Sequence, residues 1–386
     1  MKSIVIAGSL AQRPGRGGHT WVFLQYLLGF RKLGWNVLFL DRLEPEMCVD
    51  EAGAPATMER SWNVRYFVDV MRRFGLDDSY GLLCHGGTST IGLSRAHLVE
   101  RVKASAALVN VMGFLEDEEV LAAAPTRVFF DIDPGFGQMW QELGLHETFR
   151  GHDAFVTIGE NIGKPGCGTP TCGLTWITTP QPVVLDYWPV VDASTGINGP
   201  VTTVASWRGP NAPVEYEGTK YGLRAHEFRR FAALPRLAGR AFEIALDIDP
   251  ADAKDAELLR ANGWALADPQ QAAGDPFRYQ AFIQRSSAEI MIAKGMYVQT
   301  QSGWFSDRSI CYLASGKPVL AQDTALKELL PTGEGLLTFT TVEEAAEASR
   351  AIDRDYLRHA RAARRLAEQY FDSDKVLARL VRKLAL

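Results

Sequence analysis

An alternation of short apolar runs with amphipathic segments constrains the fold of this chain more than any other feature, and it begins at the N-terminus. The apolar run Ser3–Ala7 predicts a buried strand, and Thr20–Leu33 carries apolar residues at helical spacing. Gly34 ends that helix, and a second apolar run follows at Trp35–Asp41. Strand, loop, helix and strand in this order form a βαβ unit, whose parallel strands are joined by a right-handed crossover. The sequence therefore predicts an α/β fold with parallel sheets.

The alternation occurs in two series, separated by a segment rich in Gly, Pro and Thr at residues 160–200. The second series begins with the predicted strand Val201–Trp207 and includes a helix at Asp307–Ala314. A chain of 386 residues has the length of two domains of about 100–200 residues each. We expect two Rossmann-like, doubly wound domains, residues 1–195 and 196–360, which face each other across a cleft. Ligands of such sheets bind at the carboxyl ends of the strands.

Charge and cysteine content restrict the partners and the compartment. The chain has 41 Lys and Arg residues against 46 Asp and Glu residues, a net charge of −5, whereas nucleic-acid-binding proteins normally carry a basic excess. We therefore expect no nucleic-acid partner. No run approaches 18 apolar residues and no signal-peptide pattern follows Met1, so we expect no membrane span and a cytoplasmic location. The five cysteines are scattered, and Cys167 and Cys172 lack a second ligand pair nearby, so no zinc site is expected.

The loop Ser9–Trp21 follows the first predicted strand and holds candidates for the acceptor side of a site. Gly17 and Gly18 allow the backbone to approach a ligand closely, and Trp21 is a candidate for the wall of a pocket. The loop contains neither the G-x-G-x-x-G pattern of dinucleotide-binding folds nor the GK[ST] of a P-loop. His19 stands at the mouth of the following helix, where an imidazole acts either as a general base or only as a cap.

Two further strand ends lie in the same half of the chain. Asp131 and Asp133 lie at the end of a predicted strand at Arg127–Ile132, in the order Asp-x-Asp-Pro. Such a pair either binds a divalent metal through carboxylate oxygens or shapes a pocket for an acceptor, and the proline that ends the strand favours the pocket. His85 begins the glycine-rich segment HGGTST at another strand end and adds to the same rim. We predict no bound metal.

The second half offers two candidate sites for an anion. Arg208 and Lys220 lie in a long polar loop after the strand at Val201–Trp207, where cations can bind a pyrophosphate. The other site is the N-terminus of the helix Asp307–Ala314, because free N–H groups and the positive end of the helix dipole favour phosphate. The residues predicted to form it are Ser302, Gly303, Trp304, Ser306, Asp307, Arg308 and Ser309.

Together these features resemble the GT-B-fold glycosyltransferases. The segment ICYLASGKPVLAQD is similar to the family's E-A-M-A-S-G-K-P-V-V-A, and GWFS at residues 303–306 is similar to the G-W-N-S of plant-type members. The resemblance implies a C-terminal domain that binds a nucleotide-diphosphate sugar, such as a UDP-sugar, and an N-terminal domain that binds the acceptor. It also implies that the terminal helices, residues 361–386, pack back on the N-terminal domain. No cofactor besides the sugar donor is implied.

The sequence departs from the family's pattern at two places. The family often has a ribose-binding glutamate five residues before the SGKP glycine, and Cys311 stands there in this chain. A thiol cannot accept two hydroxyl hydrogen bonds as a carboxylate does, and Asp307, one turn earlier, is the candidate replacement. The family's Arg and Lys on the first loop of the C-terminal domain are also closer together than Arg208 and Lys220. The nucleotide, the sugar and the choice between inversion and retention are left open.

We accordingly expect a metal-independent glycosyltransferase of the hexosyltransferase type that acts on a small molecule, as in natural-product biosynthesis, either as a monomer or as a homodimer. The resemblance places the base of inverting members at His19, and Trp62 and Tyr66 join Trp21 as candidates for the acceptor pocket. Two alternatives stay open, namely a sugar-nucleotide epimerase of the same fold and a catalytically inactive homologue that serves as a partner subunit. A two-domain binding protein fits less well, because no signal peptide is evident.

Overall fold

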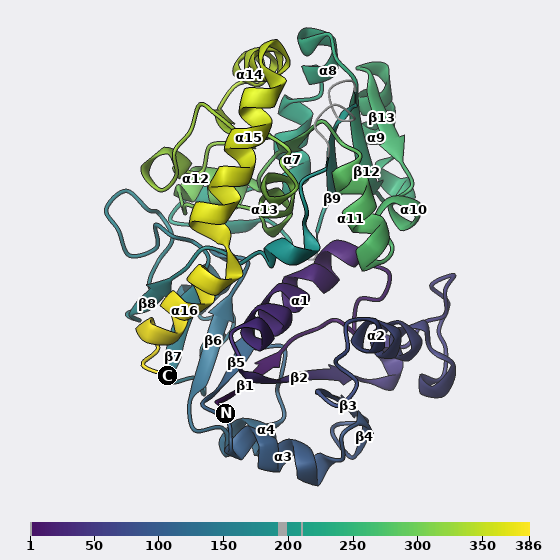
Figure 1. Cartoon of the computed structure of the whole chain (residues 1–386), viewed down its shortest axis with the longest axis vertical. Coiled ribbons are helices and arrows are strands. Elements are labelled where there is room, and N and C mark those ends of the chain that lie inside the picture. The colour runs from purple at the N-terminus through teal and green to yellow at the C-terminus, as the bar shows by residue number, and fades with distance from the viewer. Residues whose placement is uncertain (1, 192–198, 210) are drawn as a thin grey trace.

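The computed structural model describes residues 2–191, 199–209 and 211–386, and it contains two mainly parallel sheets with helices packed around them. In Figure 1 the first sheet occupies the lower part of the molecule and the second sheet the upper part. The predicted α/β class with two doubly wound units is therefore confirmed.

The first sheet has eight strands in the order β4-β3-β2-β1-β5-β6-β7-β8, so the chain runs outward from β1 on one side and then from β5 on the other. All neighbouring strands are parallel except β3 and β4, which form an antiparallel edge. The strands are β1 Ser3–Ala7, β2 Asn36–Leu43, β3 Tyr80–Cys84, β4 Ser89–Gly92, β5 Ala107–Val111, β6 Arg127–Asp131, β7 Ala154–Thr157 and β8 Trp176–Thr178. The helices of this half are α1 Gly17–Lys32, α2 Trp62–Arg73, α3 Arg95–Lys103, α4 Glu118–Ala123 and α5 Phe136–Glu142.

The second sheet has six parallel strands in the order β13-β12-β9-β14-β15-β16. They are β9 Val201–Ser206, β12 Phe242–Asp247, β13 Trp264–Ala267, β14 Ala288–Met291, β15 Val319–Gln322 and β16 Leu336–Phe339. The helices are α7 Arg224–Arg230, α8 Leu234–Ala238, α9 Ala253–Ala261, α10 Pro269–Ala273, α11 Pro276–Gln284, α12 Gly295–Thr300, α13 Asp307–Ala314, α14 Val342–Arg354, α15 Tyr356–Leu366 and α16 Ser373–Lys383. A separate hairpin, β10 Val214–Tyr216 with β11 Thr219–Tyr221, precedes α7.

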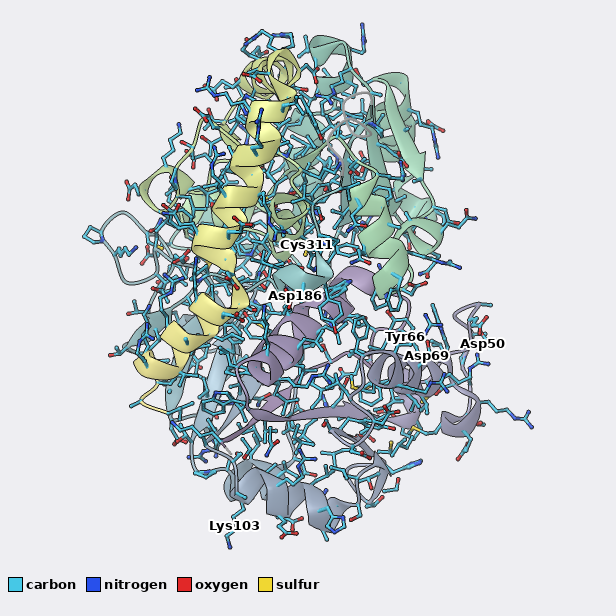
Figure 2. All side chains as sticks on the ribbon, viewed as in Figure 1. Asp50, Tyr66, Asp69, Lys103, Asp186 and Cys311 are labelled. Atoms are coloured by element: carbon cyan, nitrogen blue, oxygen red, sulfur yellow. The ribbon has the colours of Figure 1, made fainter. Side chains whose placement is uncertain are left out.

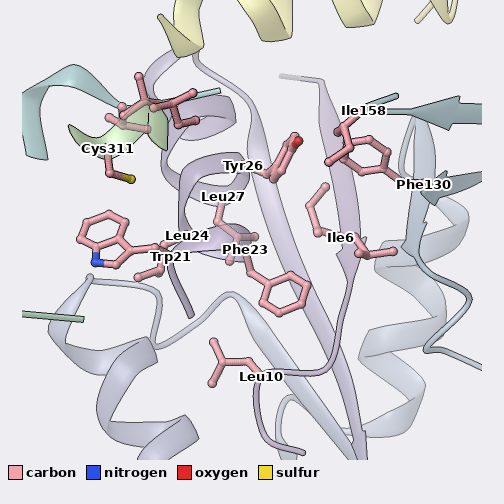
Figure 3. Close-up of a cluster of buried hydrophobic side chains, with 14 of the residues drawn as sticks. Ile6, Leu10, Trp21, Phe23, Leu24, Tyr26, Leu27, Phe130, Ile158 and Cys311 are labelled. Carbon is pink, nitrogen blue, oxygen red and sulfur yellow. The ribbon is translucent and has the colours of Figure 1, made fainter. Parts of the chain in front are cut away.

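Both faces of the first sheet are covered, which explains why its strands are continuous apolar runs. Along β1, Ile4 and Ile6 belong to one apolar cluster, while the alternating Val5 and Ala7 belong to another. The first cluster also contains residues of the second half, among them Cys311. Figure 3 shows Trp21, Leu24 and Leu27 of α1 in this cluster with Cys311 nearby. The two halves therefore share one apolar core.

Helix α1 is buried on nearly all sides, because the first sheet, α11 and α16 all pack around it. The chain crosses between the halves in α15 and returns to the first half in α16, which lies beside α1 in Figure 1. The contact is close at Gly29, where an added Cβ would lie 2.6 Å from Leu377 Cδ1 and 3.0 Å from Ser373 Cβ. A larger residue there would require the Leu377 side chain or α16 to move.

Three elements differ from the sequence-based predictions. Strand β8 lies inside residues 160–200, which are predicted to be loop, and the β10–β11 hairpin lies in the polar loop after β9. Each of these strands has three residues, too few to show a period of two. The hairpin turn is formed by Glu217 and Gly218, which both have positive φ (49° and 73°), as a two-residue type I′ turn requires.

Candidate functional site

A cleft of about 970 Å³ lies between the carboxyl ends of the two sheets. Its walls come from the loop after β1, the loops after β9 and β12, the start of α10 and the N-terminal end of α13. Ligands of open parallel sheets bind at this edge, because the loops there differ in length and leave a crevice where the strand order reverses. The cleft is therefore the candidate active site.

The glycines after β1 allow this loop to pack closely against its neighbours, including the second half of the chain. An added Cβ at Gly17 would lie 2.2 Å from the carbonyl oxygen of Asp275 and 2.8 Å from that of Ala273. An added Cβ at Gly15 would lie 2.1 Å from Trp62 Cη2 and 2.9 Å from Gln270 Oε1. The predicted role of Gly17, close approach to a ligand, is therefore secondary. Gly17 and Gly18 line the cleft, but at Gly17 the absence of a side chain lets the second half dock directly on the loop.

Asp41, the last residue of the apolar run that predicts β2, organises this loop. Its carboxylate accepts hydrogen bonds from Ala11 N at 2.6 Å, Gln12 Nε2 at 3.1 Å and Arg42 N at 2.7 Å. Burial raises the pKa of Asp41 to about 7, although these hydrogen bonds oppose the shift. Sequence reasoning missed Asp41, and the available signal was a carboxylate at the end of an otherwise apolar strand.

His19 lines the cleft, and its surroundings define its tautomer. Nε2 lies 3.1 Å from both the carbonyl oxygen and the hydroxyl of Ser9. The carbonyl oxygen can only accept, whereas the hydroxyl can donate or accept, so we assign the proton to Nε2. The lone pair is then on Nδ1. Burial, assisted by the charges of Arg13 and Arg16, lowers the pKa of His19 to about 4, so the ring is neutral near pH 7. A neutral imidazole with a free lone pair can accept a proton from an acceptor hydroxyl.

The N-terminal end of α13 forms the opposite wall. Ser306 caps the helix by accepting a hydrogen bond from Arg308 N at 3.2 Å. The side chain of Arg308 is only 8% exposed. Its Nε donates to Glu289 Oε1 at 2.5 Å and its Nη1 donates to the carbonyl oxygen of Val204 at 2.9 Å. Trp304, Ser306, Asp307 and Arg308 all line the cleft, as predicted for this segment.

The remaining residues predicted for this wall lie behind it. Ser302, Gly303 and Ser309 are buried and do not line the cleft. Gly303 has φ near +70°, and an added Cβ there would lie 2.8 Å from Leu329 Cδ1 and 2.9 Å from Asn161 Nδ2. These three residues shape the turn into α13, and their place behind the wall does not support the predicted contact with the donor.

Sequence reasoning missed Arg224, at the start of α7. Arg224 lines the cleft, and its Nε is buried without a hydrogen-bond partner in the part of the chain that the structure describes. No carboxylate of those residues lies within ion-pair distance of its guanidinium. Burial, followed by the charge of Arg308, lowers its pKa. A partly buried guanidinium without an anion is costly, so this position is suited to binding one from the ligand.

The two cations predicted for the loop after β9 behave differently. Arg208 lines the cleft but is exposed and forms a two-point ion pair with Asp252, both distances being 2.6 Å. Lys220 is exposed on β11 and does not line the cleft, so the geometry does not support its predicted role as a diphosphate ligand. The hairpin turns Lys220 away and brings Arg224, four residues later, to the site.

Most residues predicted for the acceptor side also serve the fold. Trp21 is 2% exposed in the core and donates from Nε1 to the carbonyl oxygen of Pro276 at 2.9 Å. His85 is exposed in the turn between β3 and β4. Tyr66, labelled on α2 in Figure 2, is buried against Thr20 at 2.9 Å. Trp62 does line the cleft, so it is the aromatic candidate that the structure places there.

Asp131 and Asp133 do not face a common point. Asp131 is buried and accepts hydrogen bonds from Gln138 Nε2 at 2.7 Å and Thr157 Oγ1 at 2.9 Å, and burial raises its pKa to about 6. Asp133 reaches the second half, where it forms an ion pair with Lys294 at 2.5 Å. Asp131 therefore closes its own loop and Asp133 joins the two halves, and neither lines the cleft.

Cys311 also faces away from the cleft. Its thiol donates to the carbonyl oxygen of Asp307 at 3.3 Å, and Gln25 Nε2 of α1 donates to its sulfur at 3.7 Å. Figure 2 labels Cys311 near the middle of the molecule, close to the meeting of the two halves. The carboxylate of Asp307, by contrast, lines the cleft.

Over residues 2–191, 199–209 and 211–386, no three His, Cys, Asp or Glu side chains lie close enough together to hold a metal ion. Within the same ranges, each helix is too short or too polar to cross a membrane.

Two parallel sheets with a cleft between their carboxyl ends, and a terminal helix that returns to the first sheet, define the GT-B fold of glycosyltransferases. An alpha-glucosyltransferase solved with UDP and a 13-mer DNA aligns over 100% of this chain and 99% of its own, with a TM-score of 0.61 and 12% identity. AviGT4, a glycosyltransferase involved in avilamycin A biosynthesis, aligns over 99% and 97%, with a TM-score of 0.53 and 12% identity. Anabaena Alr3699/HepE, solved with UDP, aligns over 100% of both chains, with a TM-score of 0.55 and 12% identity.

No family model and no curated protein sequence matches the chain. At 12% identity the structural likeness establishes the fold alone, and at that level the resemblance seen in the sequence is confirmed.

The expectation that nucleic acid is excluded as a partner is wrong, because alpha-glucosyltransferases of this fold are solved in complex with DNA. The net charge of −5 belongs to the whole chain, whereas five arginines line the cleft, namely Arg13, Arg16, Arg208, Arg224 and Arg308. Charge at a site depends on which side chains face it, so the balance over the sequence cannot exclude a polyanion.

Proposed function

We propose that the chain is a glycosyltransferase that moves a sugar from a nucleotide-diphosphate sugar to an acceptor hydroxyl without a metal ion. The observation that carries this proposal is the pairing of Arg224 and Arg308 with the N-terminus of α13 in one wall of the cleft. Two guanidinium groups and the free N–H groups of a helix stabilise the charge that a diphosphate develops as it leaves. These groups supply the positive charge that a metal would otherwise supply.

In this reaction the bond between the anomeric carbon and the diphosphate oxygen breaks, and a bond to the acceptor oxygen forms. The acceptor hydroxyl loses its proton, and His19 Nδ1 is the group we assign to receive it if the sugar is transferred with inversion. Because the pKa of His19 is about 4, proton transfer has to accompany bond formation and cannot precede it. In a retaining reaction His19 would only orient the sugar or the acceptor.

We propose UDP as the nucleotide, because two of the three neighbours described above, the alpha-glucosyltransferase and HepE, are solved with UDP. For the acceptor we propose a small molecule. A cleft of about 970 Å³ has the size of a small-molecule site, and AviGT4 works in the biosynthesis of such a product. The alpha-glucosyltransferases bound to DNA make nucleic acid the competing acceptor to test.

The test begins with titration calorimetry of the purified chain against UDP, ADP, GDP, CDP and dTDP. The matching nucleotide sugar is then incubated with a panel of small-molecule alcohols and, separately, with duplex DNA that contains hydroxymethyl-pyrimidine bases, and products are identified by mass spectrometry with and without EDTA. We expect UDP binding and glycosylation of a small molecule that EDTA does not prevent. Absence of binding to all five diphosphates would refute the donor assignment, and an epimerised nucleotide sugar without an acceptor would identify an epimerase.

A further inference from the structure

Glu289 is an exception among the residues of β14, because it is a carboxylate at the centre of an apolar strand. Its side chain is 0% exposed, and its neighbours along the strand are Ala288 and Ile290. Oε1 accepts one hydrogen bond, and Oε2 has no hydrogen-bond partner among the described residues. A buried carboxylate is costly unless it is paired, so its presence calls for a reason.

Arg308 is the group that pairs with Glu289, and its contacts fix the direction of the guanidinium. Nε donates to Glu289 Oε1 at 2.5 Å, and Nη1 donates to the carbonyl oxygen of Val204 at 2.9 Å. Nη2 makes no hydrogen bond to any residue that the structure describes. Because Arg308 lines the cleft, the edge that Glu289 and Val204 leave unoccupied is the edge available to a ligand.

The pair also fixes the charge of Arg308. Burial lowers the pKa of this guanidinium, but the charge and hydrogen bond of Glu289, together with Tyr279 and Asp307, offset that effect, so the pKa lies above its usual value. The cation in the cleft wall is therefore present at every pH at which the protein folds.

We propose that Glu289 is a positioning residue that holds Arg308 in place to bind the diphosphate of the sugar donor. This inference rests on the proposed function and adds to it a residue that never touches the ligand.

A purely structural role for the pair is the competing explanation, and the physics of buried ion pairs separates the two. Apolar residues of similar size can often replace a buried ion pair with no loss of stability, whereas removal of one partner alone is destabilising. If Glu289 and Arg308 served stability only, their joint replacement would leave ligand binding unchanged. If they serve binding, the joint replacement keeps the fold and loses the affinity for a diphosphate.

The experiment compares UDP affinity, measured by calorimetry, with thermal stability in four proteins. These are the wild-type chain, Glu289→Met/Arg308→Met, Arg308→Lys, and the control Glu243→Met/Arg285→Met. The control removes an ion pair between β12 and the C-terminal end of α11, and neither residue lines the cleft. We expect the first double variant to melt within a few degrees of wild type and to bind UDP at least tenfold more weakly. The control is expected to bind UDP as wild type does.

The Arg308→Lys variant keeps the inference testable if the double variant does not fold. A lysine cannot bond Glu289, Val204 and a phosphate with the fixed fork of a guanidinium, so we expect UDP affinity to fall at least fivefold. Wild-type UDP affinity in the folded double variant, or in Arg308→Lys, would overturn the inference.

A double-mutant cycle of Glu289→Met and Arg308→Met provides the second check. The single variant is expected to weaken UDP binding about tenfold, and the same change made in an Arg308→Met background is expected to have no further effect, because Glu289 acts through Arg308. Equal effects in both backgrounds would overturn the positioning role. A wild-type chain that binds no nucleoside diphosphate refutes the proposed function instead, so the two failures are distinguishable.

Discussion

Replacement of Gly17 by alanine tests whether the glycine loop joins the two halves or only admits a ligand. The new Cβ would lie 2.2 Å from the carbonyl oxygen of Asp275, 2.6 Å from its carbonyl carbon and 2.8 Å from the carbonyl oxygen of Ala273. A normal carbon–oxygen contact is about 3.3 Å, so the backbone of residues 273–275 has to move by about 1 Å. Backbone atoms cannot rotate away as the end of a side chain can.

Overpacking of this kind costs about 1–3 kcal/mol, which for a chain of this size corresponds to a decrease of a few degrees in melting temperature. The displaced segment lies between α10 and α11, and α10 also lines the cleft, so UDP affinity is expected to fall together with stability. Calorimetry on one preparation measures both quantities.

Gly18→Ala is the matched control, because its Cβ would approach only the ring of Tyr279, at 3.0 Å, and a side chain can adjust. We expect it to lose less than half as much stability as Gly17→Ala. A Gly17→Ala protein with the wild-type melting temperature would refute the docking role, and the same protein with lost UDP binding would show that the glycine serves ligand approach.

Three further predictions concern the site and its pH dependence. His19→Ala is expected to abolish transfer while UDP affinity stays within twofold, and full activity of the variant would remove His19 from the reaction. Because the pKa of His19 is about 4, the wild-type rate should be level from pH 6 to 8 and fall as the pH approaches 4. Arg224→Met should weaken UDP binding at least tenfold, about 1.4 kcal/mol, whereas Lys220→Ala should change it less than twofold. A larger loss of UDP affinity in Lys220→Ala than in Arg224→Met would contradict the geometry. Asp41 has a pKa of about 7 in the folded protein, above its usual value near 3.8, so between these values the native state holds a proton that the unfolded state releases. The contribution of Asp41 to stability therefore falls as the pH rises from 4 to 7. The difference in melting temperature between wild type and Asp41→Asn should narrow over that range. A constant difference would show that Asp41 is ionised in the folded protein.

Local patterns were sufficient to predict the α/β class, because each strand and helix buries a face whose period is written in neighbouring residues. The strand Ser3–Ala7 and the helix Asp307–Ala314 occur in the structure with the predicted bounds. The same reasoning predicted that the carboxyl ends of the strands would form a cleft, with His19 on one side and Arg308 on the other.

The direction of individual side chains was beyond those patterns. Lys220 and Arg224 are both cations after β9, and only the β10–β11 hairpin, whose turn depends on positive φ at Glu217 and Gly218, decides which of them faces the ligand. An aromatic side chain such as Trp21 is typical of a pocket wall, yet α1 is enclosed on nearly all sides and the ring of Trp21 lies in the core.

The sequence by itself determined the α/β class and the alternation of strands and helices in two series, since hydrophobic period and glycine stops act over a few residues. Tertiary structure alone decided which residues distant in the sequence come into contact. Glu289 and Arg308 are 19 residues apart, Asp133 and Lys294 are 161 apart, and Gly17 meets Asp275 from the other half of the chain. Such contacts depend on how whole elements pack, and no local periodicity records that packing.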